Sequence, residues 1–206
     1  MKRPNYQEQI KKRIEAAESG TVFIPSDFFD IAESVTVNMC LNRLVENLTL
    51  NRIMWGVFSK PRYSDLLNTK VPPRSDDIAK AIARNYGWTV IPCGDTALNM
   101  LGLSTQVTSV WLYISDGPYK TYKADGITLK FKHTDNKNET VNVSYQTALV
   151  IQALKALGKG NITYMDIRKL SEKLSPNEKQ KMLAESQRIT AWVYRYIKEI
   201  CKGVDE

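Results

Sequence analysis

The residues whose types and spacing could do chemistry lie between positions 36 and 62. Hydroxyl, amide and guanidinium groups at helical spacing can hydrogen-bond the edges of base pairs in the major groove of DNA. Arginine and lysine side chains farther along can meet backbone phosphates, which position a protein on a duplex without selecting a sequence. The candidate contact residues are Thr36, Asn38, Asn42 and Arg43, followed by Arg52, Trp55, Lys60 and Arg62. The first four also suit any helix face in water, so the surrounding elements decide between these interpretations.

The first group lies on the second of two predicted helices. Val22–Ile24 is a short apolar run that suits a strand, and Ser26 can cap a short helix after it. A second helix begins at Ser34. Its apolar residues are spaced four, three and four apart, which marks a buried face and leaves the candidate residues on the opposite one. These apolar residues are Val37, Leu41, Leu44 and Leu48.

A two-strand ribbon holds the second group. Leu50–Met54 and Val57–Phe58 are predicted strands, and Gly56 suits the reversal between them. Pro61 ends the second strand. Arg52, Lys60 and Arg62 are expected along this wing. Helix, turn, helix and ribbon is the plan of a winged helix-turn-helix, which places one helix in a DNA groove and the ribbon on the backbone. The main alternative is the same fold used for protein contact.

A helix over Asn5–Glu18 is predicted before this unit, because Tyr6, Ile10 and Ile14 share one face. A basic run lies off that face, at Lys11, Lys12 and Arg13. It suits either a solvated surface or phosphate contact.

The composition of the 206 residues is that of a globular protein, with 43% hydrophobic and 25% charged residues. The net charge of +7 favours phosphate-bearing partners, although the excess is modest. No apolar run is long enough for a membrane span, and the basic start lacks the apolar core of a signal peptide. Cys40, Cys93 and Cys201 are scattered, which predicts reduced thiols. We expect a cytoplasmic protein.

Catalytic chemistry finds little support in the sequence. His133 is the only histidine and lies in a polar run that suits a loop, which argues against a histidine-dependent mechanism. Gly94-Asp95-Thr96 lacks the further glycines and the lysine of a P-loop. The acids that a metal-dependent nuclease would need, Asp76, Asp77, Asp95 and Asp125, share no recognisable spacing. We therefore expect no enzyme activity, no cofactor and no metal site.

The run FIPSDFFD, continued by NRLVENLTLNRIMWGVFSKPRYSDLL, resembles the N-terminal domain of AbiEi-type antitoxins of type IV toxin–antitoxin systems. Pro72-Pro73 and IAKAIARNYGWTVIPCGDTALNMLGLSTQV are similar to the segment that follows in that family. The matching residues of this second segment are Pro92, Gly94, Ala97, Asn99, Leu101, Gly102, Leu103, Ser104, Thr105 and Gln106. The resemblance covers about residues 5–135, and the last seventy or so residues fall outside it.

This resemblance implies a bacterial DNA-binding antitoxin that represses its own operon and counteracts a nucleotidyltransferase-like toxin. Direct contact with the toxin stays open, as does the choice between a homodimer and a monomer bound to repeats. The alternatives are a stand-alone winged-helix repressor without a toxin partner and a metal-dependent nuclease with a DNA-binding head.

The rest of the chain contains further patterns that predict helices and strands. A helix is predicted over Ser75–Tyr86 with Ser75 as its cap, and a strand over Trp88–Ile91. An antiparallel meander is expected over Val107–Ser115, Tyr119–Tyr122 and Ile127–Lys132, because Asp116-Gly117-Pro118 is a strong turn signal. Helical segments follow over Tyr145–Leu157, from Thr163, from Ser175 and up to Cys201, with start signals Thr163/Asp166 and Ser175/Glu178.

The predicted fold class is α+β. We expect a winged helix-turn-helix DNA-binding domain at 1–67, a small mixed α/β antitoxin-like domain with the meander at 68–140, and a helical C-terminal region at 141–206. Either the chain's own core or a partner protein is expected to cover the apolar stripe of the last helix.

Overall fold

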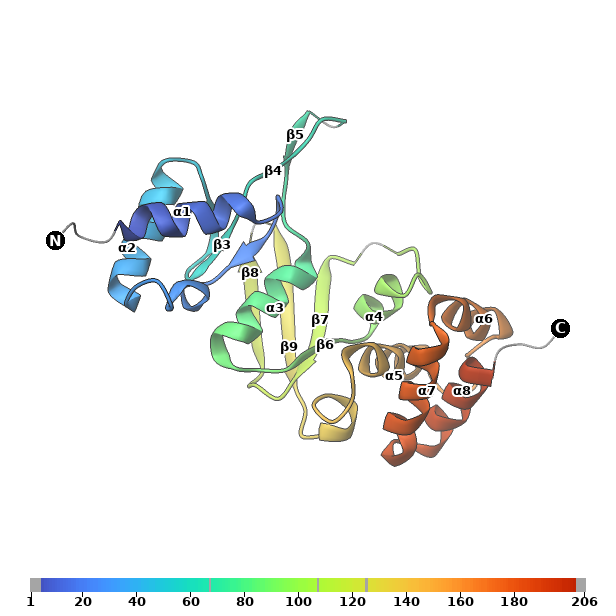
Figure 1. Cartoon of the computed structure of the whole chain (residues 1–206). Helices are drawn as coiled ribbons and strands as arrows, with labels where there is room; N and C mark the ends of the chain where they lie inside the picture. Colours follow the sequence, from blue (N-terminus) through green and yellow to red (C-terminus); the bar gives the residue numbers. More distant parts are fainter. Residues whose placement is uncertain (1–4, 67, 107, 125, 203–206) are drawn as a thin grey trace. The chain divides into compact units, whose positions relative to one another are not determined.

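The computed structural model describes residues 5–66, 68–106, 108–124 and 126–202 (Figure 1). These residues form eight α-helices and several small sheets, so the protein is of mixed α and β class, as predicted. The chain divides into two compact units. One comprises Met1–Gly87 and Ala124–Gly126, and the other comprises Trp88–Lys123 and Ile127–Glu206.

The first unit begins with a helix, a strand, a short helix, a second long helix and a hairpin. In chain order these are α1 (Tyr6–Ala16), β1 (Val22–Phe23), the 3-10 helix η1 (Pro25–Phe28), α2 (Ser34–Glu46), β2 (Asn51–Met54) and β3 (Val57–Ser59). The three strands form one antiparallel sheet in the order β1-β3-β2. The predicted ribbon and its reversal at Trp55-Gly56 are confirmed.

Helix α2 buries most of the face that its spacing predicts. The buried residues of α1 and α2 join Phe28, Leu50 and Phe58 in one core, and they are Ile10, Ile14, Val37, Cys40, Leu41 and Leu44. Leu48 was expected on this face, but it is exposed. The helix ends at Glu46, and Leu48 takes a left-handed φ of 57°. Backbone N–H groups of Thr49 and Leu50 then turn back to the Leu44 carbonyl and close the helix end.

The short helix before α2 begins earlier than predicted. Pro25 occupies its first turn, where a fixed φ favours helix initiation. Asp27, rather than Ser26, supplies the side-chain contact, since its carboxylate accepts from the Ile24 N–H at 2.9 Å. The Ser26 cap is therefore wrong, and the element is a single 3-10 turn.

A second hairpin and a helix complete this unit. Strand β4 (Arg62–Ser64) pairs with β5 (Thr69–Val71), and among the described residues neither pairs with another strand. Helix α3 (Ser75–Tyr86) packs on β1 and β3, and its residues Ile78, Ala81 and Ile82 are buried. Its bounds match the prediction, but the capping position is Arg74 and Ser75 is already helical.

The second unit is built on a four-stranded sheet. Its strands are β6 (Val90–Pro92), β7 (Val110–Ser115), β8 (Lys120–Ala124) and β9 (Ile127–His133), in the order β6-β7-β9-β8. The predicted antiparallel meander is wrong, because β9 lies beside β7 and pairs with it in parallel. Strand β8 lies at the edge.

The contacts of Gly117 explain why β7 and β8 do not form a hairpin. The Thr89 N–H donates to Asp116 Oδ1 at 2.7 Å, and His133 Nδ1 lies 2.8 Å from the Gly117 carbonyl. Both contacts hold this segment at the end of the sheet, where Ser115 pairs with His133. The connection therefore leads past β9 instead of reversing beside β7. Alternation in β9 predicts which side chains face the core, but it does not specify the neighbouring strand.

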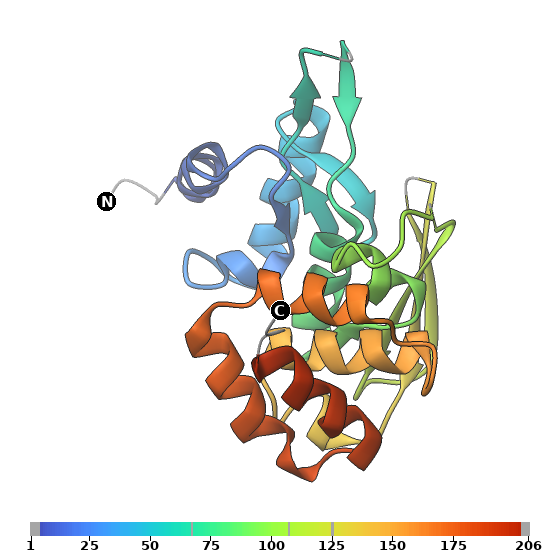
Figure 2. The ribbon, with the colours of Figure 1, turned by 90° about the vertical axis from the view of Figure 1, so that its right-hand side faces the viewer.

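Helices form the rest of the second unit. They are α4 (Asp95–Met100), α5 (Tyr145–Leu157), α6 (Tyr164–Lys173), α7 (Pro176–Glu185) and α8 (Ala191–Lys202), with short 3-10 helices η2 (Lys137–Glu139) and η3 (Ser186–Arg188). Figure 2 shows α5 to α8, coloured orange to red, packed together. The capping boxes at Thr163/Asp166 and Ser175/Glu178 are confirmed. The apolar stripe of α8 lies in the unit's own core through Val193, Ile197 and Ile200.

These contacts differ from the predicted three-domain division. Helix α3, expected in a middle domain, belongs to the first unit because its apolar face covers β1 and β3. Helix α5, expected in a separate helical region, packs on β6 and α4 and so joins the second unit. Within the described part of the chain, no helix combines the length and apolarity needed to cross a membrane.

Candidate nucleic-acid interface

The solvent face of α2 carries most of the first group of candidate residues. Asn38, Asn42 and Arg43 are exposed, while Thr36 is half-buried. Because α2 buries its apolar side against α1, this polar face is fixed by the core rather than by surface contacts. The Asn38 amide donates to the Ser34 carbonyl at 2.8 Å, which ties it to the first turn. The side chains of Asn42 and Arg43 extend from the C-terminal part of the helix, with Arg43 in its last turn.

Arg52 joins the β2–β3 hairpin to this helix. Its Nη2 donates to Asn42 Oδ1 at 2.6 Å. The guanidinium also lies over the rings of Phe58 and Trp55, with 5.1 Å and 5.9 Å to the ring centroids. Stacking and a hydrogen bond fix the orientation of a side chain that would otherwise be free in water. Arg52, Asn42 and Trp55 therefore form one continuous surface across two elements.

Trp55 lies at the tip of this hairpin and is 90% exposed. An indole so open to water is unusual, since tryptophan is normally among the well-buried residues. Gly56 beside it has a φ of 72°, so the backbone reverses in a conformation that other residues resist. The reversal holds the Trp55 side chain outward at the edge of the surface.

Lys60 and Arg62 do not share this surface. Both follow β3, whereas the Trp55-Gly56 turn precedes it, so they lie at the opposite end of that strand. The Lys60 ammonium donates to the Glu15 and Ala17 carbonyls at 2.7 Å each, and so caps the C-terminal end of α1. Arg62 begins the second hairpin. Pro61 ends the predicted wing before Arg62. Of the three cations expected to contact phosphates along the wing, only Arg52 lies beside α2.

Two exposed apolar residues of α2 lie beside the candidate contacts. Val35 and Met39 are 73% and 51% exposed, on the same helix as Asn38 and Asn42. Val35 comes four residues before Met39, and this spacing is the signal that could have placed Val35 on the same side of the helix. Apolar side chains in a groove contact the methyl group of thymine.

Two cations of the basic run of α1, Lys11 and Arg13, have acidic partners. The partner of Arg13 is distant in sequence, so spacing along the chain could not show it. Arg13 makes a bidentate pair with Asp30, with N–O distances of 2.7 and 2.6 Å. Hydrogen bonds from Arg13 hold the pKa of the Asp30 carboxyl below its ordinary value. Lys11 lies 3.6 Å from Glu15, and Lys12 is exposed.

Groups suited to catalysis or metal binding are dispersed. Among the described residues there is no group of three or more histidine, cysteine or acidic side chains placed to hold a metal ion. Asp76 pairs with Lys80, Asp95 lies in the second unit, and Asp125 lies outside the described residues. The three cysteines are free, and burial raises the pKa of the Cys93 thiol to about 11.

Together these features define a protein of mixed α and β class whose N-terminal unit presents a polar, basic helix face joined to an aromatic hairpin tip. Residues 9–183 match a family of unknown function, DUF6088, and the chain belongs to this family. The match runs from α1 into α7 and thus covers both units. No protein with a curated description matches the sequence.

Proposed function

We propose that this protein binds duplex DNA through a winged helix-turn-helix, with α2 in the major groove and the β2–β3 turn against the backbone. The observation that carries the proposal is the bond from Arg52 to Asn42, which joins the wing to the helix through side chains suited to DNA. A helix whose polar face only contacts water would not require a hydrogen bond to the neighbouring hairpin.

The order of elements supports the same assignment. A helix, a strand, a short helix, a long helix and a hairpin occur in the order that a winged helix-turn-helix requires, and β1 completes the sheet beside β3. In that arrangement the second long helix is the recognition helix. Here that helix is α2, whose exposed face carries Asn38, Asn42 and Arg43.

We further propose that the protein is a repressor of its own operon and the antitoxin of a type IV toxin–antitoxin system. The support is the resemblance of FIPSDFFD and of the Pro92–Gln106 segment to AbiEi-type antitoxins. On this proposal the first unit binds operator DNA, and the second unit counteracts a nucleotidyltransferase-like toxin. The protein acts in the cytoplasm by binding, without a catalytic step of its own.

A stand-alone repressor would use the same α2 surface but would have no toxin partner. Co-expression with the adjacent reading frame separates the two functions. If that frame encodes a nucleotidyltransferase-like toxin, growth should be inhibited by its expression alone and restored by this protein. Continued inhibition would reject the antitoxin role and leave the repressor.

The DNA-binding proposal is tested by hydroxyl-radical footprinting of the DNA upstream of the gene. A helix in the major groove with a wing on the backbone should protect sugar residues at intervals of about one helical turn. A uniform cleavage pattern at saturating protein would reject sequence-specific binding.

A further inference from the structure

We infer that a second site, apart from the α2 surface, binds a phosphate group in a pocket of the first unit. The pocket has a volume of about 520 Å³ and is walled by the loop after α1, by β4 and by α3. We call it the Arg62/Arg74 pocket. Its basic side chains are Arg62, Arg74, Lys80 and Arg84, and its acidic ones are Glu18 and Asp77.

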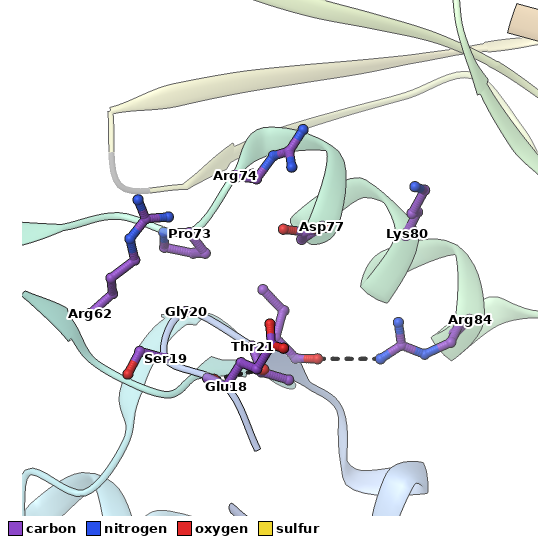
Figure 3. Close-up of a pocket in the computed structure, with 11 residues that line it drawn as sticks. Glu18, Ser19, Gly20, Thr21, Arg62, Pro73, Arg74, Asp77, Lys80 and Arg84 are labelled. Carbon is purple, nitrogen blue, oxygen red and sulfur yellow. Dashed lines mark hydrogen bonds between the residues drawn. The ribbon is translucent and has the colours of Figure 1, made fainter. Parts of the chain in front are cut away.

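Two of the four cations are already neutralised. Lys80 lies 2.6 Å from Asp76, and Arg84 lies 3.1 Å from Asp27. Arg84 also donates to the Val22 carbonyl at 3.4 Å, the contact drawn in Figure 3. The contacts of Arg84 tie α3 to the segment around β1, whereas the Lys80–Asp76 pair lies within α3. Neither Lys80 nor Arg84 supplies the binding charge of the pocket.

The other two cations are Arg62 and Arg74, which line the same hollow. Among the residues that the structure describes, no side-chain hydrogen bond or ion pair engages either guanidinium group. Figure 3 shows their side chains on either side of Pro73. Two guanidinium groups that line one pocket suit an anion with several oxygens, because a guanidinium donates two parallel hydrogen bonds to phosphate.

The backbone of the loop after α1 is held close beside Arg62 and forms one wall of the pocket. Gly20 has a φ of 87°, and a Cβ built there would meet Arg62 Cδ at 3.4 Å, so the loop passes close beside the arginine. The Gly20 N–H donates to the Lys60 carbonyl at 3.0 Å, and the Lys60 N–H donates to Thr21 at 2.9 Å. These bonds fix one wall. Helix α3 begins at the other wall, where its dipole favours negative charge.

The acids in the pocket set the strength of binding. Asp77 lies in the first turn of α3 and Glu18 on the facing loop, so both would repel a bound anion. They also accept hydrogen bonds from hydroxyl or amino groups attached to a phosphate. The ligand is therefore a phosphate ester, borne by a small molecule or by a nucleic-acid backbone.

Calorimetric titration of the full chain with inorganic phosphate and with adenosine monophosphate, at constant ionic strength, tests the inference without DNA. Saturable binding by the wild type is expected. The double variant Arg62→Gln/Arg74→Gln should bind about tenfold or more weakly, because each change removes a charge-assisted contact. Lys70→Gln, an exposed cation of β5 outside the pocket, should bind as the wild type does. Asp77→Asn should bind about two- to fivefold more tightly, since a repulsive charge is lost.

The double variant should bind phosphate more weakly and Asp77→Asn more tightly, and a folding defect would not change the affinity in opposite directions. Thermal melts test whether the variants fold. Tighter binding of the nucleotide than of inorganic phosphate would assign a small phosphorylated ligand. A different result is that inorganic phosphate and the nucleotide bind equally well, while the double variant binds duplex DNA more weakly and with a smaller slope of log affinity against log salt. That result would assign a backbone phosphate of DNA as the ligand of the pocket. No saturable phosphate binding by the wild type, or equal binding by the double variant, would overturn the inference whether or not α2 binds DNA.

Discussion

At the scale of single residues, Arg52 and Lys60 have different roles although both were predicted as phosphate contacts. Arg52 is exposed and bonded to Asn42, whereas the Lys60 ammonium is bound to the carbonyls that end α1. Sequence indicates that a cation follows a strand, but it does not indicate which carbonyls lie within its reach. The contrast makes the two residues a matched pair for mutation.

Arg52→Gln should weaken binding to all duplexes and reduce the slope of log affinity against log salt by about 1, because one phosphate contact is lost. Lys60→Gln should leave that slope unchanged and lower the free energy of unfolding by about 1–2 kcal/mol, because two helix-terminal carbonyls lose their donor. Anisotropy titrations at several salt concentrations and urea denaturation measure the two effects. If the salt slope changes in Lys60→Gln and not in Arg52→Gln, then Lys60 and not Arg52 contacts phosphate.

Gly117 is required by close approach rather than by its backbone angles. A Cβ built on Gly117 would lie 2.3 Å from Trp88 Cδ2, well inside contact distance. Gly117→Ala should therefore lower the free energy of unfolding by about 1–3 kcal/mol through overpacking. Chemical denaturation measures the loss. Combination with Trp88→Leu should recover part of it, since neighbouring changes are not additive, and an additive double variant would contradict the contact.

We expect His133 to make the stability of the second unit depend on pH. The Gly117 carbonyl and then the Asp135 carboxylate, which accept hydrogen bonds from the ring, raise the pKa of His133 above its ordinary value. The stabilisation is therefore complete below pH 6.5 and is lost as the pH rises through the folded pKa. Urea denaturation between about pH 5 and pH 8 should show this loss, and His133→Gln should abolish it. An identical pH profile for the variant would exclude the ring as its source.

At the scale of elements, the helices and the β2–β3 hairpin follow local signals closely, but the strand pairing of the four-stranded sheet does not. The bounds of α3 and α5 match prediction, and the boxes at Thr163 and Ser175 form, because capping and helical periodicity involve residues a few positions apart. The parallel pairing of β7 with β9 depends on where the Gly117 segment is held, which involves Thr89 and His133. Such long-range contacts leave no spacing in the sequence.

Glu185 connects two helices of the second unit. From the end of α7 its carboxylate accepts the Ser144 N–H at 3.0 Å and the Thr147 hydroxyl at 2.6 Å, at the start of α5. Burial raises the pKa of Glu185, but these hydrogen bonds outweigh burial and bring the pKa below its ordinary value. The stabilisation is present above pH 4.5 and is lost as the pH falls through the folded pKa.

Glu185→Gln should therefore lower the free energy of unfolding at neutral pH and flatten its decline in acid. Urea denaturation as a function of pH measures both changes. Lys181, which lies 3.8 Å from Glu185, supplies the control, because Lys181→Gln removes only a long contact made by an exposed lysine. An equal loss in both variants would show that the ion pair, and not the helix cap, is responsible.

At the scale of the whole molecule, the division into two units suggests two separable tasks. DNA contact is proposed for the first unit and toxin neutralisation for the second. The predicted boundary near residue 67 is displaced to Gly87, because α3 covers the sheet of the first unit. Sequence therefore located the proposed DNA-binding residues of α2 but not the end of the unit that holds them.

If the tasks are separable, Arg43→Ala should lose repression and keep growth rescue. Reporter expression from the upstream promoter and growth during toxin expression measure the two properties in the same cells. Loss of both in a stably folded variant would show that toxin neutralisation requires DNA contact, and the two-task account would fail.

The central claim is that α2 reads duplex DNA, and the most direct measurement is the affinity of the full chain for a labelled duplex from upstream of its gene. The wild type should bind with a dissociation constant below about 1 µM in excess competitor DNA. Arg43→Ala should bind about 1–3 kcal/mol more weakly, as expected for an arginine that reads a base. Lys130→Ala, which removes an exposed charge from β9, should bind as the wild type does. Equal affinity of Arg43→Ala and wild type, or no binding above competitor, would contradict the account.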